Sequence, residues 1–210
     1  MRVLHSSDLH GETHKLFEHR DFDVWLDTGD FFPNASRGNI PIEEDFQTRW
    51  FGNQIEGILT WLQGRPVLSV PGNHDFVSLS RLLQRVGHTE SREITPDGVV
   101  AGDMRWSGFR NINWIMGEWA GESHHEELSG LVRRTWASQP DILVTHAPPG
   151  GILDETQGYG IGALSVALRY NPHNIHTHFF GHCHGDAGKS VDVMGVRFYN
   201  GSRGAKIINI

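Results

Sequence analysis

Five short apolar segments of this 210-residue chain each run directly into a cluster of aspartate, asparagine or histidine. The apolar residues have the length and composition of buried strands. The polar clusters that follow them are Asp8-Leu9-His10, Gly29-Asp30, Gly72-Asn73-His74-Asp75, Thr145-His146 and Gly181-His182-Cys183-His184. Because open α/β sheets place their ligands at the carboxyl ends of the strands, the sequence predicts that these clusters build one site.

Strands and helices are expected to alternate along the chain, which indicates a layered α/β sandwich. The clearest helix is predicted at residues 42–62, where apolar residues recur at steps of three and four. Other helices are predicted at residues 79–86, 123–138 and 160–170. Strands are predicted at residues 2–5, 23–26, 66–70, 99–101, 104–109, 142–145, 177–180, 191–193 and 196–199. The strand-rich last third favours some antiparallel pairing.

Composition excludes several classes of protein. The hydrophobic content of 38% is too high for a disordered chain, and no apolar run approaches the ~18 residues of a membrane helix. The net charge is −7, without blocks of lysine or arginine, so long nucleic acid is a poor partner. The charge does not exclude a small nucleotide or phosphoester as the substrate. No linker divides the chain, so we expect one domain over residues 1–210.

The cysteine count and the N-terminus bear on location. Cys183 is the only cysteine, so no internal disulfide can form, and we expect it to be a small buried side chain. The first residues lack the apolar region of a signal peptide. Both observations fit a reducing compartment, and we expect a cytoplasmic protein. The oligomeric state stays open.

The spacing within the polar clusters predicts a metal centre. Residues two apart in an extended chain point to the same side, so Asp8 can converge with His10, and His182 with His184. Oxygen and nitrogen donors suit manganese, iron, zinc, cobalt or nickel rather than copper(I) or an iron–sulfur cluster. About seven ligands are too many for one tetrahedral zinc, and two adjacent divalent ions fit better.

In this order, the motifs D-x-H, GD, GNHD, TH and GHxH resemble those of the calcineurin-like metallophosphoesterase family, from Asp8 to His184. The resemblance implies a four-layer αββα sandwich with two mixed sheets. One metal would then be bound by Asp8, His10 and His184, and the other by Asn73, His146 and His182. The Asp30 carboxylate would bridge the two ions. We expect manganese to support activity in vitro.

The same resemblance implies a mechanism. Two divalent ions share a water, lower its pKa and present hydroxide to phosphorus in line with the leaving oxygen. His74 resembles the family histidine that contacts the phosphate and protonates the leaving group as a general acid. Asp75 is assigned to orient the His74 imidazole.

Departures from the family pattern point to the substrate. The protein phosphatase branch carries GDxVDRG and an arginine just before its GNHE motif. Here Gly29-Asp30 is followed by Phe31-Phe32-Pro33-Asn34, and Pro71 precedes Gly72. The chain is more similar to the compact phosphodiesterase branch without a cap domain. Small phosphodiesters such as cyclic nucleotides are expected as substrates, with a phosphomonoesterase or a nuclease as alternatives. A non-catalytic scaffold is disfavoured, because no ligand is missing.

Two other groups of residues need an interpretation. Among the other histidines, we expect six to be solvent-exposed: His5, His14, His19, His88, His124 and His125. We expect His176 and His178, which precede a strand end rather than follow it, at the surface or beside the site. Trp106, Trp114 and Trp119 cluster in a glycine-rich stretch. Core packing is the default for these three rings, and an aromatic face offered to a nucleobase is the alternative.

Overall fold

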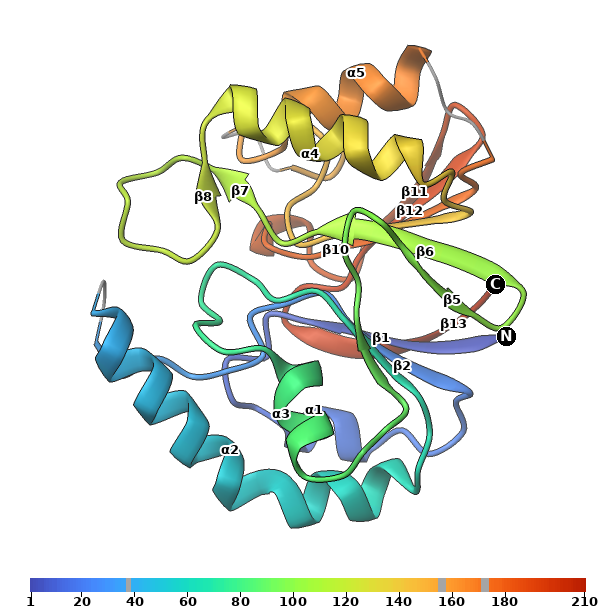
Figure 1. Ribbon diagram of the computed structural model, residues 1–210. Coiled ribbons are helices and arrows are strands. Elements are labelled where there is room, and N and C mark those ends of the chain that lie inside the picture. The colour runs from blue at the N-terminus through green and yellow to red at the C-terminus, as the bar shows by residue number, and fades with distance from the viewer. Residues whose placement is uncertain (37–38, 155–157, 171–173) are drawn as a thin grey trace.

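The computed structural model describes residues 1–36, 39–154, 158–170 and 174–210, in which two β-sheets face each other (Figure 1). The strands of the first sheet are β1 (Arg2–Ser7), β2 (Val24–Asp27), β3 (Val67–Ser69), β4 (Ser91–Glu93) and β13 (Gly204–Asn209). Their order is β13-β1-β2-β3-β4. Only β13 is antiparallel to its neighbour, so the sheet is mixed.

The second sheet is also mixed. Its strands are β5 (Val99–Ala101), β6 (Met104–Phe109), β9 (Ile142–Thr145), β10 (Thr177–Phe180), β11 (Ser190–Val193) and β12 (Val196–Asn200). The order is β11-β12-β10-β9-β6-β5, with parallel pairs in the centre and one antiparallel pair at each edge. A separate short pair joins β7 (Ile112–Asn113) to β8 (Glu122–Ser123).

Helices cover the outer face of each sheet (Figure 1). They are α1 (His14–Phe17), α2 (Ile40–Leu62) and α3 (Leu79–Arg85) on the first sheet, and α4 (His125–Ala137) and α5 (Gly162–Tyr170) on the second. A short 3-10 helix, η1 (His184–Asp186), follows β10. Among the helices of the described residues, none has the length and apolar character that crossing a membrane requires.

Three apolar cores separate the four layers. Trp25 and Trp61 belong to the core between the first sheet and its helices. Trp106 and Phe179 belong to the core between the two sheets. Trp136 and its neighbours fill the space between the second sheet and its helices. The four-layer αββα sandwich with two mixed sheets, expected from the motifs, is therefore confirmed.

Helix α2 begins two residues before its predicted start at residue 42. The Asn39 side chain accepts a hydrogen bond from the Ile42 backbone N–H at 3.3 Å, and Pro41 occupies the first turn, where its missing N–H costs nothing. The helix ends at Leu62 and is capped by Gln63, which is left-handed with φ 51°. Phe51, Ile58 and the buried Trp61 form the stripe that packs on the sheet.

Most predicted elements are present, and the differences have physical causes. The strands expected at residues 99–101, 104–109, 142–145 and 177–180 have these bounds in the structure. The antiparallel hairpin of the last third is confirmed as β11 and β12. β13 was not predicted, because its residues alternate only weakly between polar and apolar; its pairing with β1 holds it in place. Also not predicted were β4, the short pair β7 and β8, and the single-turn α1.

The expectation of solvent exposure is wrong for His5 and His88, which are buried. His178, which was expected at the surface or beside the site, is also buried. The His178 ring packs between Phe180 and Phe198, and its Nε2 lies 2.8 Å from Thr145 Oγ1. Because the Thr145 hydroxyl donates to the Ala147 carbonyl, His178 Nε2 must carry the proton of that contact. Nδ1 has no hydrogen-bond partner among the described residues, and burial lowers the pKa of His178 to about 3.

This buried imidazole predicts a pH-dependent stability. Below the unfolded pKa of about 6.5, the unfolded chain binds a proton that the folded chain refuses, so stability is lost as pH falls from 6.5 towards 3. We expect His178→Phe to remove this loss. Between pH 7.5 and 5.5, the free energy of unfolding of the wild type should fall by about 1.4 kcal/mol relative to the variant. Urea unfolding of both proteins at both pH values measures this change. If the difference in unfolding free energy between the wild type and His178→Phe does not depend on pH, the prediction is wrong.

Candidate metal centre and active site

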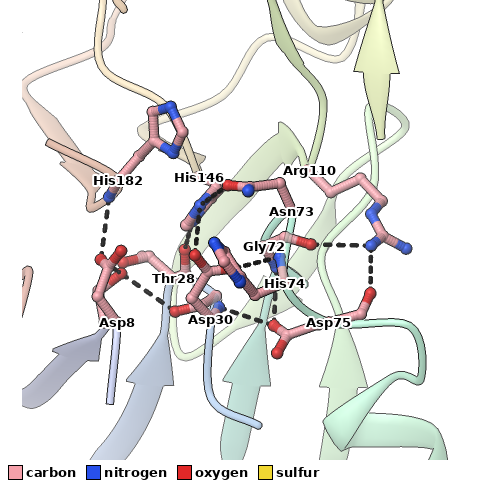
Figure 2. A network of polar contacts seen from close by, with 12 residues as sticks. Asp8, Thr28, Asp30, Gly72, Asn73, His74, Asp75, Arg110, His146 and His182 are labelled. Atoms are coloured by element: carbon pink, nitrogen blue, oxygen red, sulfur yellow. Dashed lines mark hydrogen bonds and ion pairs between the residues drawn. The ribbon is translucent and has the colours of Figure 1, made fainter. Parts of the chain in front are cut away.

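The five polar clusters meet at the carboxyl ends of strands from both sheets (Figure 2). The first sheet supplies Asp8 after β1, Asp30 after β2 and Asn73 after β3. The second sheet supplies His146 after β9 and His182 after β10. Parallel pairing of β1 with β2, of β2 with β3 and of β9 with β10 brings the ends of these strands to one edge. The single site expected from the sequence is therefore assembled across the seam between the two sheets.

One group of donor atoms is formed by Asp8, His10 and His184. Their ligand atoms all lie within 4.8 Å of one another. His184 Nε2 is 3.0 Å from Asp8 Oδ1, and the rings of His10 and His184 are 5.9 Å apart. This is the set that the family resemblance assigns to the first ion.

A second group of donor atoms surrounds His146. The ligand atoms of Asp8, Asp30 and His146 also lie within 4.8 Å of one another, so Asp8 belongs to both groups. His146 Nε2 is 3.4 Å from Asp30 Oδ2 and 3.0 Å from Asn73 Oδ1. The His182 ring centroid lies 5.0 Å from that of His146. Six of the seven predicted ligands thus lie in these two groups of atoms, and the ring of the seventh, His182, lies beside that of His146. The metal-binding role of each residue and the bridging role of Asp30 stay predictions.

The imidazole of His146 is turned so that one nitrogen faces the carboxylates. Its Nδ1 lies 2.8 Å from the Thr28 carbonyl, which can only accept, so Nδ1 carries a proton. Nε2 is the nitrogen that would bind a metal ion, with loss of its own proton, as in ligands oriented by a second partner. Burial lowers the pKa of His146, but the Asp30 carboxylate outweighs it and raises the pKa to about 9. A cation therefore suits this position.

The pKa of His182 is shifted in the direction opposite to that of His146. Burial lowers the pKa of His182 to about 4, so its imidazole is neutral at physiological pH, the state that binds a metal. Its backbone N–H donates to Asp8 Oδ2 at 2.9 Å, which joins the fifth motif to the first. Carboxylate oxygens, imidazole nitrogens and one amide oxygen around buried acids fit two divalent ions.

Backbone strain is concentrated at the predicted ligands. Asp8, His10, Asp30 and His182 have positive φ values of 53°, 45°, 57° and 66°. Each such residue costs about 1–3 kcal/mol and persists only where the surroundings enforce it. Hydrogen bonds between the loops do so, including Asp8 N–H to the Gly29 carbonyl at 2.8 Å and His10 N–H to the Asp30 carbonyl at 2.9 Å. Strain of this kind is typical of a functional site.

Glycine is required where the loops pack on one another. A Cβ on Gly72 would overlap both the Oδ1 and the backbone nitrogen of Asp30. A Cβ on Gly181 would overlap Ser7 Oγ and Asp8 Oδ2. These glycines let the carboxylates approach the neighbouring motifs closely.

His74 stands beside the ligands, and its orientation corrects the role given to Asp75. The His74 backbone N–H donates to Asp30 Oδ1 at 2.7 Å, and the ring Nδ1 lies 2.7 Å from Asn34 Oδ1. Asn34 Nδ2 donates to the His74 carbonyl and to Glu43, so Oδ1 is the acceptor for His74 Nδ1–H. Asn34 therefore orients the imidazole, with Nε2 as the nitrogen available to substrate.

The Asp75 carboxylate holds the loops instead. It accepts hydrogen bonds from the backbone N–H groups of Asp30 at 2.7 Å, Gly72 at 2.8 Å and Phe32 at 3.1 Å. Burial, with the nearby Asp30 charge, raises the pKa of Asp75 to about 6. Asp75 is thus a positioning residue for the second and third motifs, without a contact to the His74 ring among the described hydrogen bonds.

Two residues that were not predicted support His74 and its loop. Asn34 follows Asp30 by four residues in an otherwise apolar segment, and that isolated polar side chain was the available signal. Arg110 Nη2 donates to the Gly72 carbonyl at 2.8 Å and to the Asp75 carbonyl. Nothing in the sequence around Arg110 marks it, because its partners are backbone carbonyls distant along the chain.

Comparisons with known proteins agree with this geometry. A protein-family model described as calcineurin-like phosphoesterase matches residues 1–186. Among solved structures, the protein TT1561 of Thermus thermophilus has a TM-score of 0.65 at 14% identity, over 99% of this chain and 98% of that chain. The phosphopantetheinyl hydrolase of Mycobacterium tuberculosis has a TM-score of 0.51 at 15% identity, over 96% and 89%. These two likenesses show a shared fold. A search of curated proteins finds no match.

The close packing at Gly72 predicts that Gly72→Ala damages both stability and metal binding. Displacing Asp30 should lower the free energy of unfolding by about 1–3 kcal/mol, the usual cost of overpacking. Gly52→Ala is the matched control, since a Cβ there meets nothing within 4 Å and the residue is helical. Chemical unfolding and Mn²⁺ titration measure both effects. Equal behaviour of the two variants would contradict the prediction.

The Asn34 contact predicts a change in pH dependence. In Asn34→Asp, a carboxylate replaces the amide beside Nδ1 and stabilises the imidazolium, so the pKa of His74 should rise. If protonated His74 is required, the pH at which kcat declines on the alkaline side moves upward. Asn34→Leu should lower kcat roughly 10- to 100-fold, as for other partners that orient functional histidines. An unchanged pH profile in Asn34→Asp would oppose the assignment.

Proposed function

The chain belongs to the calcineurin-like phosphoesterase family, and on that premise we propose that it hydrolyses small phosphodiesters such as cyclic nucleotides. The observation that supports the proposal is the convergence of two triads of ligand atoms on the shared carboxylate of Asp8. The family is dinuclear and metal-dependent. Asp8, His10 and His184 would hold one ion, and Asn73, His146 and His182 the other, with Asp30 between them.

When bound, two divalent ions activate water and neutralise the charge on phosphoryl oxygens. The chain's own residues supply the rest of the chemistry. Asp75 keeps the second and third loops in place through three backbone N–H groups. His74 holds a proton on Nε2 for the leaving oxygen, while Asn34 Oδ1 accepts a hydrogen bond from Nδ1–H and fixes the ring plane. The His74 side chain is half-buried next to the ligands, which leaves it open to substrate.

The preference for small diesters has two supports. The second motif lacks the acid and the third the arginine of the protein phosphatase branch. The net charge of −7 disfavours a nuclease that grips long strands. A phosphomonoesterase is the second candidate, because the same donor set can serve both ester types.

The proposal also covers the domain organisation, the metal and the cellular location. We infer that residues 1–210 fold as one metallophosphoesterase domain and that manganese supports activity in vitro. The single cysteine, Cys183, is buried and cannot form an internal disulfide, which supports a cytoplasmic location.

The proposal predicts metal-dependent cleavage of bis-p-nitrophenyl phosphate in preference to p-nitrophenyl phosphate. Stripping the metal should abolish turnover, and Mn²⁺ should restore it. His74→Ala should lower kcat by ~10²–10⁴-fold, the usual contribution of a general acid. Asn73→Ala should weaken binding of Mn²⁺ as well as turnover, because it removes a ligand. Release of nitrophenolate and Mn²⁺ titration measure these effects.

A matched control is His14→Ala, which truncates an exposed histidine of α1 and should leave turnover unchanged. Preference for the monoester would replace the diesterase with a phosphatase. Absence of Mn²⁺ binding in the wild type would overturn the dinuclear centre itself.

A further inference from the structure

The segment between β7 and β8 is a wide loop at the metal end of the second sheet (Figure 1). It is folded around one carboxylate, that of Glu122. Glu122 Oε2 accepts hydrogen bonds from the backbone N–H groups of Ile115, Met116 and Gly117 at 2.7, 2.8 and 2.7 Å. Oε1 accepts two more, from residues 118 and 119. Five donors on one side chain give the loop a defined shape.

The loop is also tied to the metal centre. The Ala120 backbone N–H donates to the Asn73 carbonyl at 3.0 Å. The Trp119 ring lies against His74, with centroids 4.1 Å apart. The position of the loop is therefore set relative to a predicted metal ligand and to the predicted general acid.

A cavity of about 230 Å³ opens between this loop and His182. It is lined by Asn113, Trp114, Ile115, Gly158, Tyr159 and His182. Ligand pockets of complete small molecules are usually roughly 300–1,000 Å³, so this cavity has the size for one part of a ligand. Because His182 forms one wall, the cavity lies beside the metal centre.

The large apolar side chains that line the cavity are more exposed than side chains that serve only to pack the core. Trp114 and Tyr159 are 50% and 38% exposed, and Ile115 is 40% exposed. The Trp114 ring is stacked on His124 at 4.7 Å and 18°, which fixes the plane of the indole. The Tyr159 ring is edge-on to His182 at 5.8 Å. Core packing, the default for these tryptophans, is correct for the buried Trp106 and wrong for Trp114.

The polar groups of the cavity do not favour a charged occupant. Asn113 Nδ2 donates to the carbonyls of Tyr159 and Gly160 at 3.3 and 3.0 Å, so its amide hydrogens are used within the fold. No aspartate, glutamate, lysine or arginine lines the cavity among the described residues. The recognition chemistry on offer is stacking on a flat ring.

We propose that this cavity binds a planar aromatic ring of the substrate, a nucleobase or an aryl group, while the phosphoryl group lies at the metals. The proposal rests on the proposed phosphoesterase function and narrows its substrate class. Trp114 supplies the face on which the ring stacks, and Tyr159 and Ile115 exclude water around it.

The test is calorimetric binding to the Mn²⁺-loaded protein, with phosphonates that carry the same head group and cannot be hydrolysed at the P–C bond. The probes are methylphosphonate, cyclohexylphosphonate and phenylphosphonate. We expect phenylphosphonate to bind ~5- to ~150-fold more tightly than methylphosphonate, the range that stacking on an aromatic side chain supplies. In Trp114→Ala this ratio should fall to about one, and in Trp114→Phe most of it should remain.

Two controls make the result specific. Tyr170→Ala truncates an exposed ring at the end of α5 that does not line the cavity, and it should keep the wild-type ratio. Mn²⁺ titration of each variant shows that the metal centre is intact. A nucleoside 5′-methylenephosphonate then separates the two sources of the ring: tighter binding than phenylphosphonate assigns a nucleobase, and weaker binding an aryl group.

Three outcomes would overturn the inference. They are equal affinity of the wild type for the methyl and phenyl probes, an unchanged ratio in Trp114→Ala, and cyclohexylphosphonate binding as tightly as phenylphosphonate. Because binding is measured without turnover, the result is separate from the proposed function. If the protein hydrolyses esters with metal but Trp114→Ala keeps the phenyl-to-methyl affinity ratio, only the role of the cavity is refuted. If the ratio depends on Trp114 but no ester is hydrolysed, only the proposed activity is refuted.

Discussion

Two buried carboxylates, Asp8 and Asp30, hold together the parts of the molecule that matter for chemistry. Like charges in a low-dielectric interior repel, so each needs compensation from its surroundings. Asp8 accepts from the His182 N–H of the opposite sheet, and Asp30 accepts from the His74 N–H of the next loop. The same atoms that compensate the charges join the five motifs, and two divalent cations would complete that compensation.

The placement of the centre on the seam between two sheets follows from this. Three predicted ligand clusters extend from the first sheet and two from the second, and the core between the sheets sets their separation. Neither sheet alone presents a complete donor set. The supporting contacts also come from outside the motifs: Arg110 holds the third loop by its carbonyls, and Glu122 shapes the aromatic loop above His74.

Much of the fold and most of the centre were predictable from the sequence. Period and strand length located central strands such as β9, which is mostly apolar, as expected for a strand covered on both faces. The clusters from Asp8 to His184 could be found because metal ligands must be specific residue types at fixed spacing. The ends of helices and strands were less predictable. A helix can begin at any of several neighbouring polar residues, and only the structure shows that Asn39 caps α2.

The sequence by itself determined which residue types stand at the strand ends, and therefore the metal chemistry and the layered architecture. Only the tertiary structure decided which partner each side chain meets. Asn34 rather than Asp75 orients His74, because the fold turns the Asp75 carboxylate towards three backbone N–H groups. His178 is buried and Trp114 exposed for the same reason: burial is set by what packs against a residue, and those neighbours are distant along the chain.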